Sequence, residues 1–169
     1  MLTGVIKDKI KWTGKVTMIK KIGNKIVKKR VFCNIITNLA LNEIIKSLYG
    51  ESSMNLKYLA IGDDDTAAQA SDTQLGNEFF RAPIITQTVS GTGELTSRSI
   101  MLDSEPFDAV GPAPGFQCTI KEIGFFGGFD AISTQDSGTL IARLVLATPE
   151  DKYDNEQIAF TRVDSIERG

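Results

Sequence analysis

Short runs in which apolar and polar residues alternate make up most of this chain, and such alternation is typical of half-buried β-strands. Six of these runs follow one another in the second two-thirds of the chain; they are residues 56–62, 82–89, 95–102, 119–126, 139–147 and 157–163. Two more, residues 15–22 and 25–33, are joined by Gly23-Asn24, and a two-residue connection that begins with glycine favours a type II′ hairpin turn. Most connections are too short to hold the crossover helices that parallel strands require. The pattern therefore predicts a mainly β protein, an antiparallel β-sandwich of Greek-key or jelly-roll type.

One segment has helical spacing in place of alternation. Thr37 or Asn38 can cap a helix at its start and Gly50 can end it, which predicts one amphipathic helix over about residues 38–49. The apolar residues that recur three and four apart in it are Leu41, Ile44, Ile45 and Leu48. The polar residues on its opposite side are Asn42, Glu43, Lys46 and Ser47. We expect the apolar stripe to pack on a sheet and the polar side to face water.

The length of 169 residues, with 41% hydrophobic and 24% charged residues, is that of one globular domain that folds without a metal or a disulfide framework. The chain contains no histidine, which excludes the usual general base at neutral pH, the commonest zinc ligand and every Ser-His or Cys-His nucleophile. Cys33 and Cys118 are expected to remain free thiols, because no secretory signal accompanies them. No apolar run approaches the ~20 residues of a membrane span. We therefore expect a protein made in the cytoplasm that is not an enzyme, with no catalytic residue, cofactor, metal, small-molecule substrate or membrane partner.

The net charge of −2 hides a strong asymmetry. Residues 1–30 hold ten of the 19 basic residues and a single acidic one, Asp8, which gives this segment a charge of +9 and leaves −11 on the rest of the chain. We divide the chain accordingly into a basic N-terminal arm or hairpin, residues 1–34, and a β-sandwich domain, residues 35–169, with the helix near its start. The partner-binding candidates of the hairpin are Lys20, Lys21, Lys25, Lys28, Lys29 and Arg30.

Three interpretations of this basic hairpin remain open. It docks on an acidic neighbouring protein, because surfaces of opposite charge attract each other. Alternatively it binds the phosphates of a nucleic acid, with Trp12 and Phe32 as the stacking candidates beside its positive charges. In the third interpretation its lysines only protect an edge strand from unwanted pairing.

Glu122 needs a partner, because it lies among isoleucine and phenylalanine in residues 119–126. A carboxylate buried there is tolerated only when it is paired, and Arg81 and Arg143, each inside an apolar segment, are the candidate cations. Together with Glu78 they form a predicted set of structural salt bridges. Glu78 and Glu122 are also the obvious pair for a glycoside hydrolase, but 21 acidic residues offer many such pairs, and no stripe of aromatic residues accompanies this one.

Two other motifs lack the spacing that their ligands need. Residues 63–65, three consecutive aspartates, are candidates for a calcium site with Asp72, but they lack the alternating acids and distal glutamate of an EF-hand. An exposed turn whose aspartates bond to backbone amides is the simpler interpretation. The glycines of residues 124–128 are not followed by the Lys-Ser or Lys-Thr of a phosphate loop and are interpreted as part of a turn.

Residues 140–146 are apolar on both faces, which a sandwich strand with one side in water does not require. In one interpretation a face of this strand meets another subunit, with Ile141 and Val145 at the oligomer interface. In the other, the helix or a long loop covers the strand.

Four short motifs follow one another in the middle of the chain. They are Ala60-Ile61-Gly62-Asp63, Asp72-Thr73-x-Leu75-x-Asn77-Glu78-x-x-Arg81, Lys121-Glu122-Ile123-Gly124-Phe125-Phe126 and Leu140-Ile141-Ala142-Arg143. Their succession after an opening helix resembles the tail-collar fibre domains of bacteriophage virion proteins, over roughly residues 35–143. The chain departs from that family at Asp64, where a second glycine is common, and at Phe125, where the family has leucine.

The resemblance implies a structural component of a phage particle: a tail, collar or neck appendage or adaptor subunit that is located in the virion. Its partners would be other virion proteins and copies of the same chain, as a trimer or hexamer. A capsid decoration protein of the same virion class is one alternative, and a nucleic-acid-binding accessory protein that uses the basic arm is another. In the particle, the hairpin would dock on an acidic neighbour and the doubly apolar strand would bury against symmetry-related copies.

Overall fold

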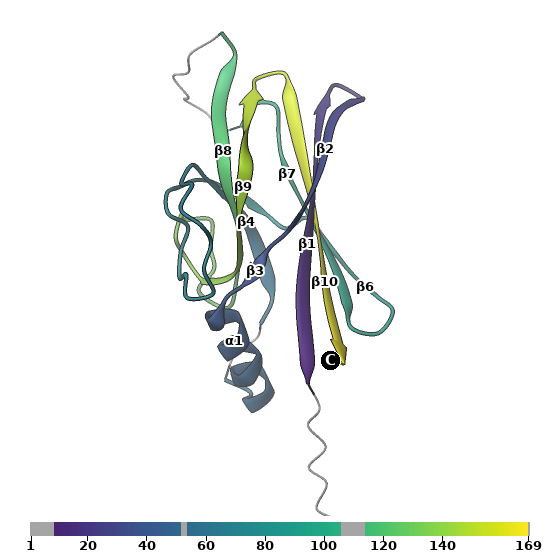
Figure 1. The fold of residues 1–169 in the computed structure, drawn as a ribbon, viewed down its shortest axis with the longest axis vertical. Helices are drawn as coiled ribbons and strands as arrows, with labels where there is room; N and C mark the ends of the chain where they lie inside the picture. The colour runs from purple at the N-terminus through teal and green to yellow at the C-terminus, as the bar shows by residue number, and fades with distance from the viewer. Residues whose placement is uncertain (1–8, 52–53, 106–113, 169) are drawn as a thin grey trace, which may run out of the picture.

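The computed structural model describes residues 9–51, 54–105 and 114–168, and within them the chain is mainly β with one α-helix. The strands form two antiparallel sheets of five strands each, and the core lies between them. Figure 1 shows the two sheets facing each other. The predicted antiparallel β-sandwich with one helix and an N-terminal hairpin is confirmed.

Each sheet combines strands from distant parts of the chain. Sheet A contains, from edge to edge, β2 (Lys25–Cys33), β1 (Ile10–Ile22), β10 (Glu156–Arg168), β7 (Glu94–Met101) and β6 (Thr86–Ser90). Sheet B contains, also from edge to edge, β3 (Ile35–Ile36), β9 (Thr139–Tyr153), β8 (Phe116–Gly127), β4 (Leu56–Gly62) and β5 (Glu78–Pro83). The helix α1 (Asn38–Tyr49) follows β3 and lies at one end of the sandwich (Figure 1).

The basic hairpin is built into sheet A. Strand β1 pairs with β10 along its whole length, and β2 continues the sheet as its edge strand. Gly23 adopts a φ of 53°, as a turn with glycine in its first central position requires. Residues 10–33 of the predicted arm are thus two strands of the sandwich, and residues 1–8 lie outside the described residues.

The run predicted as one strand over residues 82–89 is two strands in different sheets. Strand β5 ends at Pro83, which has no backbone N–H to donate to a sheet, and β6 begins at Thr86. The chain crosses from sheet B to sheet A between them. Strands β9 and β10 are longer than predicted, and the turn at residues 154–155 carries the chain from sheet B back to sheet A.

The main core lies between the two sheets. Sheet A contributes Val16, Met18 and Phe160, each at most 1% exposed, and sheet B contributes Ile61 and Ile123, both fully buried. A smaller apolar cluster lies beneath the loop between β4 and β5, and its buried members are Ala60, Leu75, Phe126 and Leu140.

A bulge in β9 turns Ile141 toward the main core. The pairing of β9 with β8 shifts register between Phe125 and Phe126, and Ile141 is the extra residue at this point. Its side chain is 2% exposed and belongs to the core cluster. Ile141 thus belongs to the core of the single chain, and its predicted contact with another subunit stays a prediction.

The helix begins and ends where the sequence predicts. Thr37 is the N-cap, and its hydroxyl oxygen accepts a hydrogen bond from the Ala40 N–H at 3.1 Å. Gly50 ends the helix in the left-handed conformation, with a φ of 84°.

The apolar stripe of the helix faces outward, which contradicts the predicted packing. A hydrogen bond from the Thr37 N–H to the Ile141 carbonyl, at 3.1 Å, sets the start of the helix against β9. The side chains that the helix buries are those of Ala40 and Glu43. The exposed members of the stripe are Leu41 (48% exposed), Ile45 (65%) and Leu48 (81%).

Candidate assembly surfaces

The basic hairpin is held by acidic residues of the same chain. Lys20 Nζ lies 2.8 Å from Glu150 and 2.9 Å from Glu156, and all three side chains are buried. Lys28 and Arg30 reach the same Glu150 carboxylate, at 2.6 and 3.3 Å. Burial alone would raise the pKa of Glu150, but the hydrogen bonds from Lys20 and Lys28 lower it. Burial alone would lower the pKa of Lys20, and its two carboxylate partners raise it.

These contacts reduce the basic surface that is open to a partner. The prediction that Lys20 binds another molecule is wrong, because its ammonium group is buried against two carboxylates of its own chain. Lys25 and Lys29 are exposed on the edge strand, and Lys21 is half-buried. Binding of a partner by these three lysines stays a prediction.

A buried ion network lies on the face of sheet B that is turned away from sheet A. Arg143 Nε donates a hydrogen bond to the fully buried Glu122 carboxylate at 2.8 Å. The same guanidinium reaches Asp72 at 2.8 Å and Asp64 at 3.1 Å. Burial alone would lower the pKa of Arg143, and the hydrogen bonds with Asp72 and Glu122 raise it. Glu122 also accepts hydrogen bonds from two backbone N–H groups of the loop between β4 and β5, at 3.1 and 2.9 Å, so the network fixes this loop to the sheet.

A second ion pair fixes the loop between β8 and β9. Arg81 binds Glu78 through two parallel hydrogen bonds, at 2.6 and 2.7 Å. Another nitrogen of Arg81 donates to the backbone carbonyl of Ser137 at 2.8 Å, and the guanidinium lies 4.2 Å from the centre of the Phe126 ring. Each of the two carboxylates considered for glycoside hydrolysis, Glu78 and Glu122, is thus paired with an arginine in a structural role.

The three aspartates at residues 63–65 each have a different partner. These partners are, in chain order, Asn77 at 2.6 Å, Arg143 at 3.1 Å and Lys121 at 3.4 Å. Across residues 9–51, 54–105 and 114–168, no group of three or more cysteine or acidic side chains is placed to hold a metal ion. The three aspartates lie in the loop between β4 and β5, and these three partners are side chains rather than the backbone amides of the simpler interpretation.

Arg162 is a charge buried in the interior of the sandwich. It is fully buried on β10, pairs with Asp164 at 2.5 Å and lies 4.7 Å from the centre of the Phe125 ring. Burial lowers its pKa, and the neighbouring Asp164 opposes that shift. Trp12 Nε1 donates to the same carboxylate at 2.9 Å. The group therefore links β1 to β10 just behind the open end of the sandwich.

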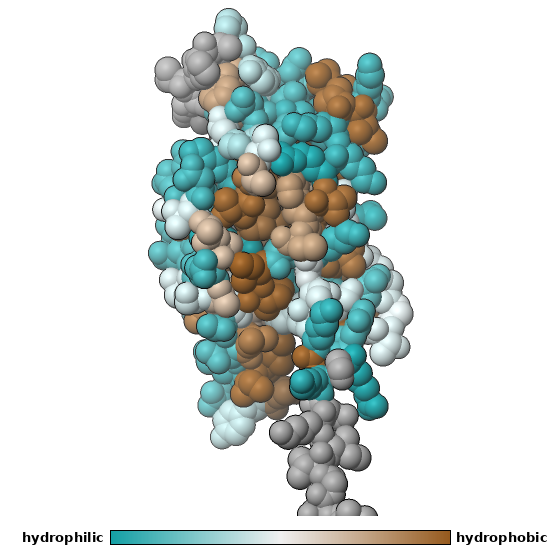
Figure 2. All heavy atoms as spheres, in the orientation of Figure 1, coloured by the Kyte–Doolittle hydropathy of each residue, from teal (hydrophilic) through white to brown (hydrophobic). Residues whose placement is uncertain are grey.

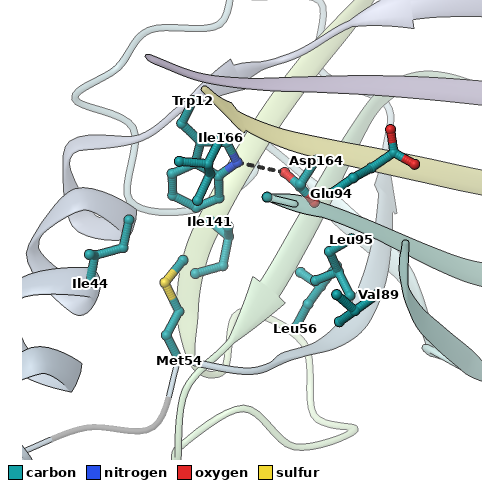
Figure 3. A pocket seen from close by; sticks show the side chains of 11 residues that line it. Trp12, Ile44, Met54, Leu56, Val89, Glu94, Leu95, Ile141, Asp164 and Ile166 are labelled. Carbon is teal, nitrogen blue, oxygen red and sulfur yellow. Dashed lines mark hydrogen bonds between the residues drawn. The ribbon is translucent and has the colours of Figure 1, made fainter. Parts of the chain in front are cut away.

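An apolar pocket of about 300 Å³ opens at this end, next to α1 (Figure 3). Both sheets and the helix contribute to its wall, through side chains that include Trp12, Ile44, Leu95, Ile141 and Ile166. The polar groups at its edge are few, and Asp164, already bonded to Trp12 and Arg162, is one of them. The pocket therefore suits an apolar side chain better than a charged ligand.

The exposed stripe of α1 continues outward from this pocket. Ile44 lines the pocket, and Leu48 and Tyr49, the latter 78% exposed, lie on the next turn. In the face of the molecule shown in Figure 2, apolar side chains gather on part of the surface at the position of α1, beside hydrophilic ones. Val89 and Ile166, also in the pocket wall, are 75% and 44% exposed. We call the stripe and the pocket together the apolar end.

Val145, the second predicted interface residue, is half-buried and lines a groove of about 530 Å³ on sheet B. Ala67 and Ala68, from the loop between β4 and β5, line the same groove. This loop therefore accounts for part of the apolar character of β9. Contact between Val145 and another subunit stays a prediction.

The four sequence motifs lie on adjacent strands of sheet B. Gly62 of β4 pairs with Glu78 of β5 and with Glu122 of β8, and Gly124 of β8 pairs with Arg143 of β9.

Comparison of the chain with protein-family models, with curated proteins and with solved structures gives no match. Within the described part of the chain, no helix is long and apolar enough to cross a membrane.

The sequence pattern did not predict two features: the exposure of the apolar end and the burial of Arg162. The first is the apolar end, because helical spacing identifies a stripe but does not say whether it is covered. The second is Arg162, although a signal for it exists: Phe160, Arg162 and Asp164 are two residues apart and so share one face of a strand.

Proposed function

We propose that this chain is a non-enzymatic structural subunit of a phage particle, an appendage or adaptor of the tail, collar or neck that acts through protein–protein assembly. The observation that carries the proposal is the apolar end. Ile45, Leu48 and Tyr49 are 65%, 81% and 78% exposed on one short helix, next to an open apolar pocket. Apolar patches of this kind mark contact surfaces, because exposing them to water is unfavourable.

The ionisable side chains support assembly rather than catalysis. Catalytic acids and bases must be free to exchange protons with a bound substrate. Here Glu122 and Arg143, and likewise Glu78 and Arg81, bind each other and fix loops to sheet B. Their arrangement gives a stable scaffold that presents other surfaces.

The phage particle enters the proposal through the sequence motifs. The tail-collar fibre resemblance suggests the virion, and the apolar end suggests how the subunit acts there. A capsid decoration protein would use the same mode of action at a different place in the particle.

The test is the composition of the particle. Particles of the phage that encodes the chain are purified on a density gradient, treated with nuclease and quantified by mass spectrometry against a known capsid protein. A phage-encoded replication enzyme serves as the control for contamination. We expect several copies of the chain per particle and none of the control; a chain found only in the unassembled lysate would overturn the proposal.

A further inference from the structure

We propose that the apolar end binds a second copy of this chain, with the two α1 helices packed antiparallel about a two-fold axis. This inference rests on the proposed function, because it names the partner of an assembly subunit. It concerns α1 and the pocket beside it, not the strand β9 or the basic hairpin.

The exposed apolar area is large enough to form most of a standard dimer interface. Leu41, Ile45, Leu48 and Tyr49 are 48%, 65%, 81% and 78% exposed. At about 150 Å² for a fully exposed large apolar side chain, they present about 400 Å² of apolar surface. The exposed parts of Val89 and Ile166 in the pocket wall raise this to about 600 Å², against the ~800 Å² of total surface that each partner contributes to a standard interface.

The stripe has the geometry of a helix–helix contact. Leu41, Ile45 and Leu48 are four and three residues apart, so they lie along one side of α1. Leu41 and Leu48 are about 10 Å apart along the helix axis, at 1.5 Å per residue, and Ile45 lies near the midpoint. In an antiparallel pair, Leu41 meets Leu48 of the partner subunit and Ile45 meets its own counterpart at the axis.

Chemistry favours an identical copy over a charged partner. A two-fold interface brings one patch against itself, so the patch must be self-complementary. The stripe carries no charge, and the charged Lys46 on the other side of the helix pairs with Glu43 at 2.8 Å. The pocket beside Ile44 offers space for an apolar side chain from the second copy.

The first experiment measures mass by light scattering after size exclusion, for the wild type and two variants. Leu48→Glu places a charge in the stripe, and the matched control Ile132→Glu places one on an apolar residue that is 53% exposed in the loop between β8 and β9. We expect the wild type and Ile132→Glu to be dimers. Leu48→Glu should be a folded monomer by circular dichroism, with the dissociation constant raised at least about 100-fold, the size of a hot-spot loss.

The second experiment tests the two-fold axis. In a Cys33→Ser background, which removes the exposed native thiol, Ile45→Cys is oxidised mildly and compared with Ile132→Cys. Cys118 is buried, so it does not form a disulfide with a second copy. We expect Ile45→Cys to form a disulfide-linked dimer at least tenfold faster than the control, because the two thiols meet at the axis.

A monomeric wild type at its highest soluble concentration would overturn the inference, as would equal rates for the two cysteine variants. Either result leaves the proposed function intact if the chain is still found in purified particles. A dimer that is absent from particles would have the opposite meaning: the inference would stand and the proposed function would fail.

Discussion

Replacing Glu122 by glutamine tests the ion network that fixes the loop between β4 and β5. The substitution keeps the shape of the side chain and removes its charge. Glu122 accepts hydrogen bonds from three donors: Arg143 Nε at 2.8 Å and two backbone N–H groups at 2.9 and 3.1 Å. A glutamine has one acceptor oxygen, so its NH₂ group faces at least one of these donors and leaves it without a partner.

The expected loss of stability depends on the contacts that Arg143 and the backbone N–H groups keep in the Glu122→Gln variant. An unsatisfied buried donor costs about 1–3 kcal/mol, and loss of one partner of an isolated buried ion pair costs about 3–5 kcal/mol. Arg143 keeps its contacts with Asp72 at 2.8 Å and with Asp64 at 3.1 Å, so its buried charge still has carboxylate partners. We expect a loss of about 2–3 kcal/mol, which for a chain of this size lowers Tm by about 5–10 °C.

The assay is equilibrium unfolding in urea, with a thermal melt as a second measure. Asp65→Asn is the matched control, because Asp65 is 77% exposed and lies 3.4 Å from Lys121 in a surface pair of little energetic weight. We expect no measurable change in the control. If Glu122→Gln were no less stable than Asp65→Asn, the account of a buried network that holds the loop would be refuted.

Three further predictions concern other parts of the fold. The pKa of Glu150 is lowered in the folded state, so its contacts with Lys20 and Lys28 stabilise the fold fully above its ordinary pKa of 4.5, and this stabilisation is lost as the pH falls through the lowered pKa. Glu150→Gln should therefore make the free energy of unfolding depend less on pH in this acidic range. An unchanged pH dependence would contradict the assignment. Burial raises the pKa of Cys118 to about 11, so at pH 8 a thiol reagent should label only Cys33 in the native protein and both cysteines in denaturant, as intact mass will show. A Cβ on Gly62 would meet a backbone carbonyl oxygen at 2.6 Å, so Gly62→Ala should cost about 1–3 kcal/mol in the same urea assay, and a wild-type midpoint would count against the close packing of β4.

Local sequence signals predicted much of the fold because they act within a few residues. The hairpin turn at Gly23-Asn24 and the helix from its Thr37 cap to Gly50 depend on neighbouring residues, and both are correct. Alternation located most strands for the same reason. The break at Pro83 was missed, because apolar residues continue through it into the next strand.

Burial depends on contacts between distant segments, and there the pattern was insufficient. The sequence pattern does not distinguish Ile141 from the other apolar residues of its strand. Ile141 faces the core because of the bulge in β9. Lys20 reads as part of a basic surface, but Glu150 and Glu156 lie on strands that the sequence does not pair with it. The stripe with Leu48 reads as a buried helix face, and the structure exposes it because β9 meets the other side of the helix.

Assembly through the apolar end is tested by the solution mass of the wild-type protein, measured at low and raised salt and with a DNA oligonucleotide in a parallel run. Apolar contacts do not weaken as salt is raised, whereas a protein with six or more phosphate contacts loses on the order of 10³-fold in affinity over this range. We expect a dimer that persists at raised salt and does not bind the oligonucleotide. A monomer that shifts in mass with DNA at low salt only would contradict this expectation and make the nucleic-acid interpretation of the hairpin the better one.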